Sequence, residues 1–172
     1  MRFTNREHAG RELAERLKFY KGRDDVVVLG LPRGGVIVAA EIADALGVSM
    51  DIYIVRKLGV PGQPELAMGA VASDGSRVVN EEVVASLGVS PAAIERVAER
   101  ETAELQRRQE TYRGDRAPPA IAGKTVIVAD DGLATGASMK VAVKAIRASG
   151  PKTLIVAVGA APAGTVAVNW TV

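Results

Sequence analysis

Two adjacent carboxylates, Asp130 and Asp131, follow a run of apolar residues and precede a loop of small residues. The apolar run at 126–129 is typical of a strand buried on both faces, and a helical pattern follows the loop. A helix start offers unpaired N–H groups and a positive dipole end to a phosphate, and Thr135 and Ser138 add hydroxyl donors. Carboxylates repel phosphate but accept hydrogen bonds from sugar hydroxyls. The segment therefore predicts a site for a ribose 5-phosphate, although an acidic pair at a helix start can also serve only as a cap.

A second strand end, after the apolar run at 26–31, carries Arg33, Gly34 and Gly35. Glycines let the backbone approach an anion closely, and the N-terminus of the next helix points to the same place. Many strand-to-helix turns contain two glycines, so the glycine pair by itself does not distinguish an anion site from an ordinary turn. Neither the dinucleotide fingerprint G-x-G-x-x-G nor a P-loop is present.

The third unusual strand end carries the basic pair Arg56 and Lys57. The next eight residues, 58–65, include two glycines and two prolines, and we predict a loop there. Without further context, the basic pair has an equally good explanation as a solvated strand end. Ligands of open parallel sheets bind beyond the carboxyl ends of the strands, which is where all three segments fall.

Residues 126–138 resemble the motif with which type I phosphoribosyltransferases bind PRPP, 5-phosphoribosyl 1-pyrophosphate. The motif consists of a hydrophobic strand, two acidic residues, a short spacer, and Thr-Gly followed by small residues. The resemblance implies that Asp130 and Asp131 are catalytic residues that hold the ribose hydroxyls. It implies that the 5′-phosphate is bound by the residues that follow, namely Ala134, Thr135, Gly136, Ala137 and Ser138.

The other two strand ends fit the same family. Residues 33–35 resemble its pyrophosphate-binding loop, and the Arg56-Lys57 pair resembles the one that precedes the flexible active-site loop of its adenine and orotate members. By this resemblance Lys57 neutralises the departing pyrophosphate and residues 58–65 close over the site to exclude water. From its place in the loop we also expect Glu65 to face the acceptor and exchange a proton with it.

The resemblance implies an enzyme that transfers ribose 5-phosphate from PRPP to a nitrogen acceptor, expected to be a nucleobase, and releases pyrophosphate. We expect Mg²⁺ to be bound mainly through PRPP, with no dedicated protein metal site, and the protein to form a homo-oligomer. Ala134 stands where hypoxanthine and guanine members have a further Asp, so the chain resembles the adenine and orotate branches there. Only 160–172 remain for the C-terminal hood that binds the acceptor in the family. A hood would then come from the N-terminal helix, the helix at 90–112 or another subunit.

Two other classes of function remain open. One is a PRPP-sensing regulator of the same fold that binds nucleic acid elsewhere, although no helix-turn-helix or basic-aromatic platform is evident. The other is a phosphoaspartate receiver or a phosphatase that uses Asp130. It is disfavoured because the Thr-Gly segment at the helix start would then have no function. A nucleic-acid partner and a membrane partner are not expected.

Strands alternate with helices along the sequence, and this pattern predicts one α/β domain over 1–172. We expect an open, mostly parallel sheet of about five strands flanked by helices. The 172 residues include 48% hydrophobic and only 3% aromatic residues, which suits a Val-, Ala- and Leu-rich parallel sheet. A helical segment at about 81–115 is inserted before the PRPP-motif strand. Its main helix begins at Ser90-Pro91, and its charged faces, which include Arg100, are predicted to be solvated.

Composition excludes several kinds of site. The chain contains no cysteine and one histidine, His8, so a thiolate metal site and a metal site with two imidazoles are excluded, and a Ser-His-Asp triad is not expected. A net charge of +2 is too small to indicate nucleic-acid binding. Neither a secretory signal nor an apolar run long enough to span a bilayer is found, so the expected location is the cytoplasm. Thr4 and Glu7 predict a capping box at the first helix.

Overall fold

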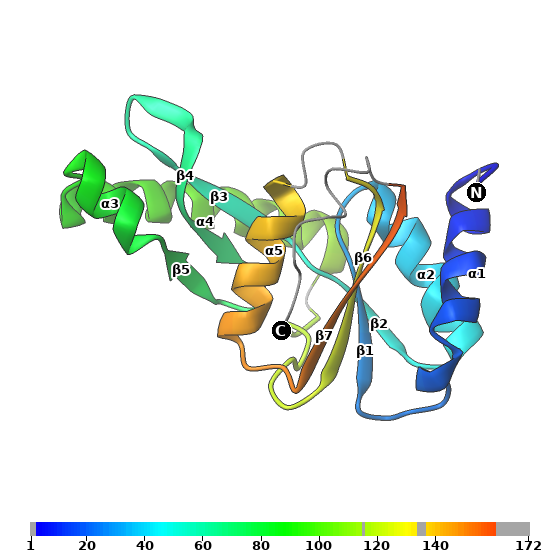
Figure 1. The fold of residues 1–172 in the computed structure, drawn as a ribbon. Helices are drawn as coiled ribbons and strands as arrows, with labels where there is room; N and C mark the ends of the chain where they lie inside the picture. The colour runs from blue at the N-terminus through cyan, green and yellow to red at the C-terminus, as the bar shows by residue number, and fades with distance from the viewer. Residues whose placement is uncertain (1–2, 115, 134–136, 161–172) are drawn as a thin grey trace.

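A parallel sheet of four strands lies at the centre of the computed structural model, which describes residues 3–114, 116–133 and 137–160 (Figure 1). The strands are β1 (Val26–Gly30), β2 (Ser49–Ile52), β6 (Thr125–Gly132) and β7 (Thr153–Ala160). Their order is β2-β1-β6-β7, and each neighbouring pair is parallel. The predicted α/β class is confirmed, with four strands in this sheet where about five were expected.

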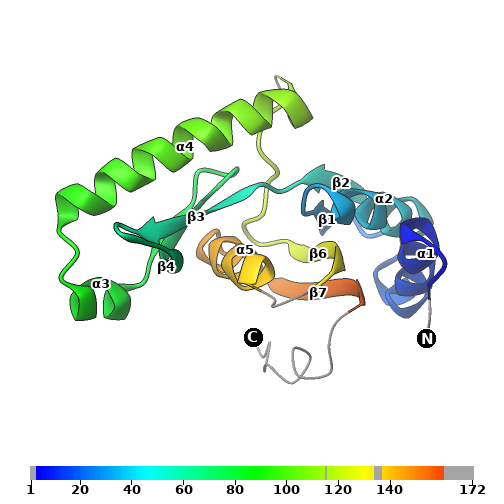
Figure 2. The ribbon, with the colours of Figure 1, turned by 90° about the horizontal axis from the view of Figure 1, so that it is seen from above.

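Helices cover both faces of the parallel sheet (Figure 2). One face carries α1 (Arg6–Arg16) and α2 (Gly34–Leu46), and the other carries α5 (Ala137–Ala148); a short 3₁₀ helix, η1 (Lys18–Tyr20), follows α1. Val26 and Val28 of β1 pack in the α2 layer, whereas Val27 and Leu29 pack in the α5 layer. Burial on both faces explains why this strand is a continuous apolar run in the sequence.

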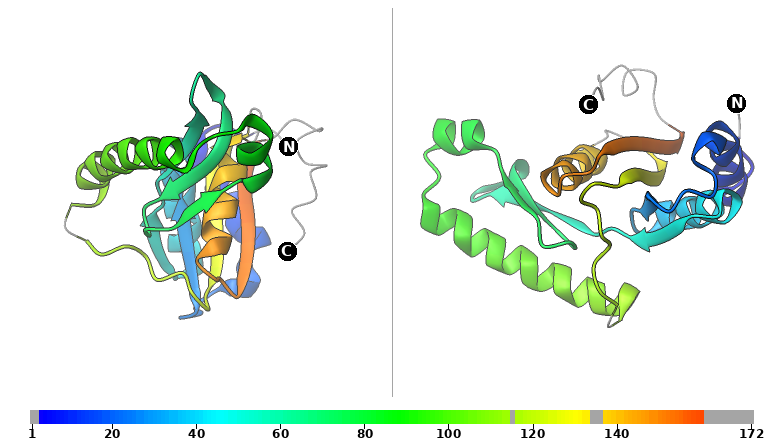
Figure 3. Two further views of the ribbon diagram at one scale, coloured as in Figure 1. Left: turned by 90° about the vertical axis from the view of Figure 1, so that its left-hand side faces the viewer. Right: turned by 90° about the horizontal axis from the view of Figure 1, so that it is seen from below.

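A second, antiparallel sheet lies beside α5 (Figure 3). It consists of β3 (Val55–Val60), β4 (Gln63–Ala72) and β5 (Arg77–Val79), in the order β3-β4-β5. Two helices follow it in the chain, α3 (Glu81–Leu87) and α4 (Pro91–Arg113). Leu58 and Met68 of this sheet pack with Val97 and Leu105 of α4 in one apolar cluster. This packing fixes α4 along the second sheet.

The prediction of a loop at residues 58–65 is wrong, because this segment is the end of a β-hairpin and most of its residues belong to the two strands. β3 pairs with β4 from Val55 to Val60, and only Pro61 and Gly62 form the turn between them. Gly62 has φ +80°, which suits the position after proline in a type II turn. Pro64 lies within β4, opposite an irregularity in the register at Gly59. The glycines and prolines therefore shape a hairpin instead of interrupting it.

The start of α1 differs from the predicted capping box. Asn5, not Thr4, is the N-cap, and its side chain accepts a hydrogen bond from the backbone N–H of His8 at 2.8 Å. The Thr4 hydroxyl lies 3.1 Å from the His8 ring nitrogen Nδ1, so it is engaged elsewhere. A short strand that the sequence suggests at 165–172 lies outside the described residues. Among the helices that the structure describes, none has both the length and the apolar character needed to cross a membrane.

Candidate functional site

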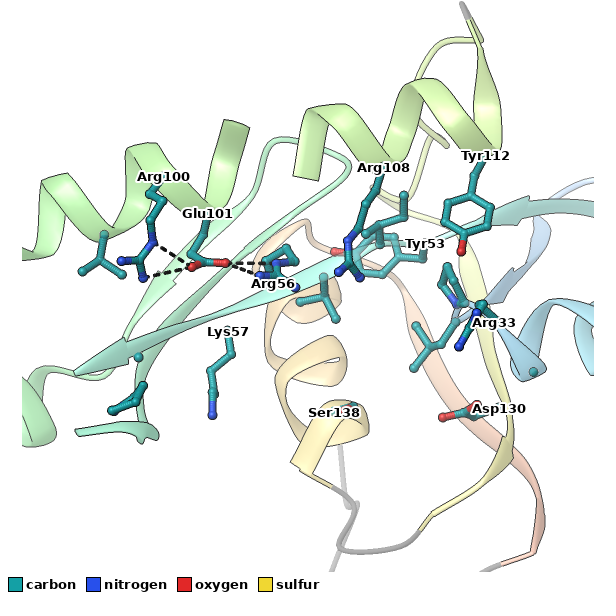
Figure 4. Close-up of a pocket in the computed structure, with 18 of the residues that line it drawn as sticks. Arg33, Tyr53, Arg56, Lys57, Arg100, Glu101, Arg108, Tyr112, Asp130 and Ser138 are labelled. Carbon is teal, nitrogen blue, oxygen red and sulfur yellow. Dashed lines mark hydrogen bonds and ion pairs between the residues drawn. The ribbon is translucent and has the colours of Figure 1, made fainter. Parts of the chain in front are cut away.

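A cavity of about 780 Å³ opens where the parallel sheet, the hairpin and α4 meet (Figure 4). The carboxyl ends of β1 and β6 contribute the loop after β1 and the acidic pair, β3 contributes a basic pair, and α4 forms a wall. The polar and charged residues that line the cavity are Arg33, Tyr53, Arg56, Lys57, Arg100, Glu101, Arg108, Tyr112, Asp130, Asp131 and Ser138. A cavity of this size is in the range of small-molecule sites.

The acidic pair lies at the end of β6, where burial decreases along the strand. Burial raises the pKa of Asp130 to about 6, and the neighbouring Asp131 carboxylate adds to this effect. Burial is the largest single influence on Asp131 and acts to raise its pKa, but hydrogen bonds with Arg6 and Asp130 and the charge of Arg6 together outweigh it, so the pKa is lowered. The Arg6 Nε donates to Asp131 Oδ2 over 2.7 Å. The two neighbouring carboxyls therefore differ: Asp131 is held ionised from α1, and Asp130 takes up a proton more readily.

The start of α2 touches the acidic pair through its first two residues, Gly34 and Gly35. A Cβ on Gly35 would lie 2.5 Å from the Ala129 carbonyl oxygen and 2.9 Å from Asp130 Cα. A Cβ on Gly34 would overlap the Asp131 carboxylate. Two consecutive glycines are thus needed for the start of α2 to reach the end of β6. Arg33 occupies the N-cap position of α2 and lines the cavity. The peptide bond between Pro32 and Arg33 is cis.

Only part of the predicted phosphate loop can be placed. Ala134, Thr135 and Gly136 lie outside the described residues. Ala137 is the first residue of α5, and Ser138 is exposed and lines the cavity. Ser138 is thus brought into the same cavity as Asp130, as the sequence predicts for a phosphate site next to a ribose site.

The predicted catalytic residues of the hairpin occupy different places. Lys57 lines the cavity, and its Nζ donates to the Glu65 backbone oxygen at 3.2 Å. The Glu65 carboxylate lies 4.0 Å from the same Nζ, but its side chain is 99% exposed and does not line the cavity. Arg56 also lines the cavity and donates twice to one oxygen of Glu101, at 2.6 and 3.0 Å. The structure therefore brings Lys57, but not Glu65, to the acidic pair's cavity.

Residues of α4 were missed as site residues, because the charged faces of this helix were predicted to be solvated. Glu101 is buried at the cavity wall, and Arg108 and Tyr112 line the cavity further along the helix. The one signal in the sequence is their spacing, since residues four apart share a helix face. That spacing does not reveal which element the face meets.

Comparisons with known proteins agree on one family. The model of the phosphoribosyl transferase domain matches residues 3–168. A protein of Mycobacterium tuberculosis strain H37Rv, provisionally named a phosphoribosyl transferase, is 47% identical over 165 residues, which are 96% of this chain and 37% of the relative. The chain thus spans little more than a third of the length of the curated relatives it matches.

Two crystal structures carry the same arrangement of elements. The protein TT1426 from Thermus thermophilus is 44% identical, with a TM-score of 0.85 over 96% of this chain and 78% of that chain. The purine phosphoribosyltransferase from Pyrococcus horikoshii is 19% identical, with a TM-score of 0.51 over 89% of this chain and 70% of that chain. At that identity the second likeness shows the fold alone.

Proposed function

Because the chain belongs to the phosphoribosyl transferase domain family, we propose that it binds PRPP and transfers the ribose 5-phosphate to a nitrogen acceptor, with release of pyrophosphate. The observation that carries this proposal is the contact between the Gly34-Gly35 loop and the Asp130-Asp131 pair at the edge of a cationic cavity. An anion-binding loop beside two sugar-binding carboxylates suits a substrate that is both a sugar and a pyrophosphate.

Each described group has a role in this reaction. Asp130 and Asp131 accept hydrogen bonds from the 2′- and 3′-hydroxyls of ribose, and residues 134–138 bind the 5′-phosphate. The C1′–O bond breaks through an oxocarbenium-like state, and the electron pair leaves with pyrophosphate. Residues 33–35 and Lys57 stabilise that departing charge, an electrostatic role that commonly dominates catalysis.

Magnesium fits this donor set when most of its ligands come from PRPP and water. No group of three or more potential metal-binding side chains occurs among the described residues. Hard Mg²⁺ is commonly held by one or two carboxylates and substrate oxygens, and Asp130 offers a carboxylate at the cavity. When bound, the ion supplies positive charge to the pyrophosphate oxygens.

The acceptor is proposed to be a nucleobase. The proton that the acceptor nitrogen loses requires a base, and Glu65 remains a candidate only if the hairpin closes, since its side chain now faces solvent. The homo-oligomeric state and the cytoplasmic location expected from the sequence stay predictions.

The test is calorimetric titration of Mg–PRPP into the wild-type protein and into Asp130→Asn and Asp131→Asn. Each substitution removes a charged acceptor, a loss of about 1.5–3 kcal/mol, so affinity falls roughly tenfold or more. Asp24→Asn, at an exposed position in the turn before β1, is the matched control and keeps wild-type affinity. Unchanged affinity in both site variants would refute the sugar-binding assignment.

A second assay separates transfer from sensing. Pyrophosphate release is followed with a panel of purine and pyrimidine bases in the presence of Mg–PRPP. Release with one base establishes the transferase and names its acceptor. Tight PRPP binding without release from any base favours the regulator over the enzyme.

A further inference from the structure

The wall of the cavity formed by α4 carries two polar side chains that the proposed reaction does not yet use. Arg108 and Tyr112 lie one helical turn apart on the same face of α4, and both line the cavity. Figure 4 shows both side chains projecting from α4 into the cavity, with the Tyr112 hydroxyl directed toward Arg33. Among the residues that the structure describes, neither that hydroxyl nor the Arg33 guanidinium has a hydrogen-bond partner.

Arginines outnumber carboxylates along this wall. Glu101 is bound by two arginines, Arg56 on β3 at 2.6 Å and Arg100 on α4 at 3.1 Å. That cluster of three side chains has one carboxylate and two guanidinium groups, so it carries one net positive charge. A positive charge at a cavity wall favours an anionic ligand.

A second cluster of the same composition includes Arg108. Glu104 is bound by Arg107 at 2.9 Å and by Arg108 at 2.8 Å. Hydrogen bonds from Arg107 and then from Arg108 lower the pKa of Glu104 to about 2, so this carboxylate is ionised at neutral pH. Arg107 makes two hydrogen bonds to Glu104 on its own. Arg108 can therefore turn to a ligand without leaving Glu104 unpaired.

The position of α4 in the cavity can be related to the leaving group through Arg33. In Figure 4, Arg33 lies between Asp130 and Tyr112, and all three line the cavity. Under the proposed function Asp130 holds the ribose and Arg33 meets the pyrophosphate, so a pyrophosphate that extends past Arg33 approaches α4. An acceptor that displaces pyrophosphate attacks C1′ from the opposite side, which places the acceptor away from this wall.

We propose that Arg108 and Tyr112 of α4 bind the terminal phosphate of the pyrophosphate group of PRPP, with Arg108 as an ionic donor and Tyr112 as a hydroxyl donor. The proposal rests on the proposed function and adds a helix outside the parallel sheet to the pyrophosphate site. Arg33 and Lys57 then bind the phosphate nearer to C1′. Guanidinium N–H groups donating to phosphate oxygens form strong charge-assisted hydrogen bonds, which suits this position.

The test compares three ligands by calorimetric titration: Mg–PRPP, Mg–pyrophosphate and ribose 5-phosphate. The variants are Arg108→Gln, Tyr112→Phe and, as the matched control, Arg107→Gln. Arg107 binds the same Glu104 but does not line the cavity. We expect Arg108→Gln to weaken PRPP and pyrophosphate roughly tenfold and Tyr112→Phe to weaken both by about fivefold. Ribose 5-phosphate, which lacks the pyrophosphate, keeps its wild-type affinity in every variant, and Arg107→Gln keeps all three affinities.

Each other outcome has a defined meaning. Equal effects of Arg108→Gln and Arg107→Gln, or an equal loss for ribose 5-phosphate, would overturn the assignment of the α4 wall while leaving the proposed function intact. A wild-type protein that binds neither PRPP nor pyrophosphate would overturn both. If Arg108→Gln unfolds, Arg108→Met and Tyr112→Phe decide, since Arg108→Met removes the charge but keeps most of the aliphatic stem, and Tyr112→Phe removes only the hydroxyl. Unchanged PRPP affinity in both of these variants would overturn the inference.

Discussion

Substitution of Gly34 by alanine tests the contact between the loop after β1 and the acidic pair. In the structure a Cβ at this position overlaps the Asp131 carboxylate, so one of the two must move. The Asp131 side chain lies at the rim of the sheet and is held by the hydrogen bond from Arg6 at 2.7 Å. We expect the carboxylate to rotate away, because moving the backbone of both β6 and α2 costs more.

The magnitudes of the two effects differ. Overpacking typically costs about 1–3 kcal/mol. Because the Asp131 side chain is free to rotate away, we expect Gly34→Ala to lower the free energy of unfolding by about 1 kcal/mol. Rotation removes a charged acceptor from the ribose hydroxyls, which costs about 1.5–3 kcal/mol of PRPP binding. Affinity for PRPP should therefore fall roughly tenfold to a hundredfold, while the fold remains stable.

The assay combines calorimetric titration of Mg–PRPP with urea unfolding of the same preparation. Gly132→Ala is the matched control, because among the described residues its Cβ would meet only the Ala160 carbonyl oxygen, at an ordinary 3.5 Å. The reasoning is refuted if Gly34→Ala binds PRPP as tightly as Gly132→Ala does. A large loss of stability with unchanged affinity in the folded fraction would also refute it.

Three further predictions follow from the same contacts. The folded-state pKa of Asp130, about 6, lies above that of an Asp in the unfolded chain, so the native state binds this proton more tightly. The free energy of unfolding should therefore decrease as the pH rises from about 4 to 6. Urea titrations should show a smaller decrease for Asp130→Asn, which lacks this proton-binding group. Glu101→Ala leaves the half-buried Arg56 without its buried partner and should destabilise the protein by about 3 kcal/mol. Glu95→Ala, at an exposed ion pair with Arg77, should cost less than about 1 kcal/mol, and equal costs by urea unfolding would contradict this. The β3–β4 hairpin is expected to close over bound PRPP, so amide exchange at residues 58–65 should slow when Mg–PRPP is added, and identical exchange with and without the ligand would end the idea of a lid.

Local patterns in the sequence predicted the parallel sheet and its strand ends. The apolar runs at 26–31 and 126–129 indicate strands buried on both faces, because helices cover both sides of a parallel sheet and neither face is left to polar side chains. The acidic pair ends β6 and the glycine pair follows β1, and since parallel strands end at one edge, the meeting of these two pairs was predictable. Arg56 and Lys57 were expected after a strand of the same sheet, but they lie within β3 of the antiparallel sheet, so the rule of the shared edge does not explain why Lys57 lines the cavity.

Segments whose conformation depends on distant partners were not predictable in the same way. Residues 58–65 contain the glycines and prolines of a loop, but pairing of Gly59 and Val60 with β4 makes a hairpin, and only Pro61 and Gly62 turn. Strand pairing is a property of two segments, so composition alone does not decide between a loop and a hairpin.

The role of α4 was decided only by tertiary structure. Its sequence shows which residues share a face, and from that Arg108 and Tyr112 are neighbours. The packing of Val97 and Leu105 against the second sheet sets the rotation of the helix, and this rotation brings the Arg108 face to the cavity. The sequence by itself thus determined the chemistry at the strand ends, because the order of strands and loops is local. The tertiary structure decided what lies opposite that chemistry, because the wall of a cavity is built by contacts between residues far apart in the chain.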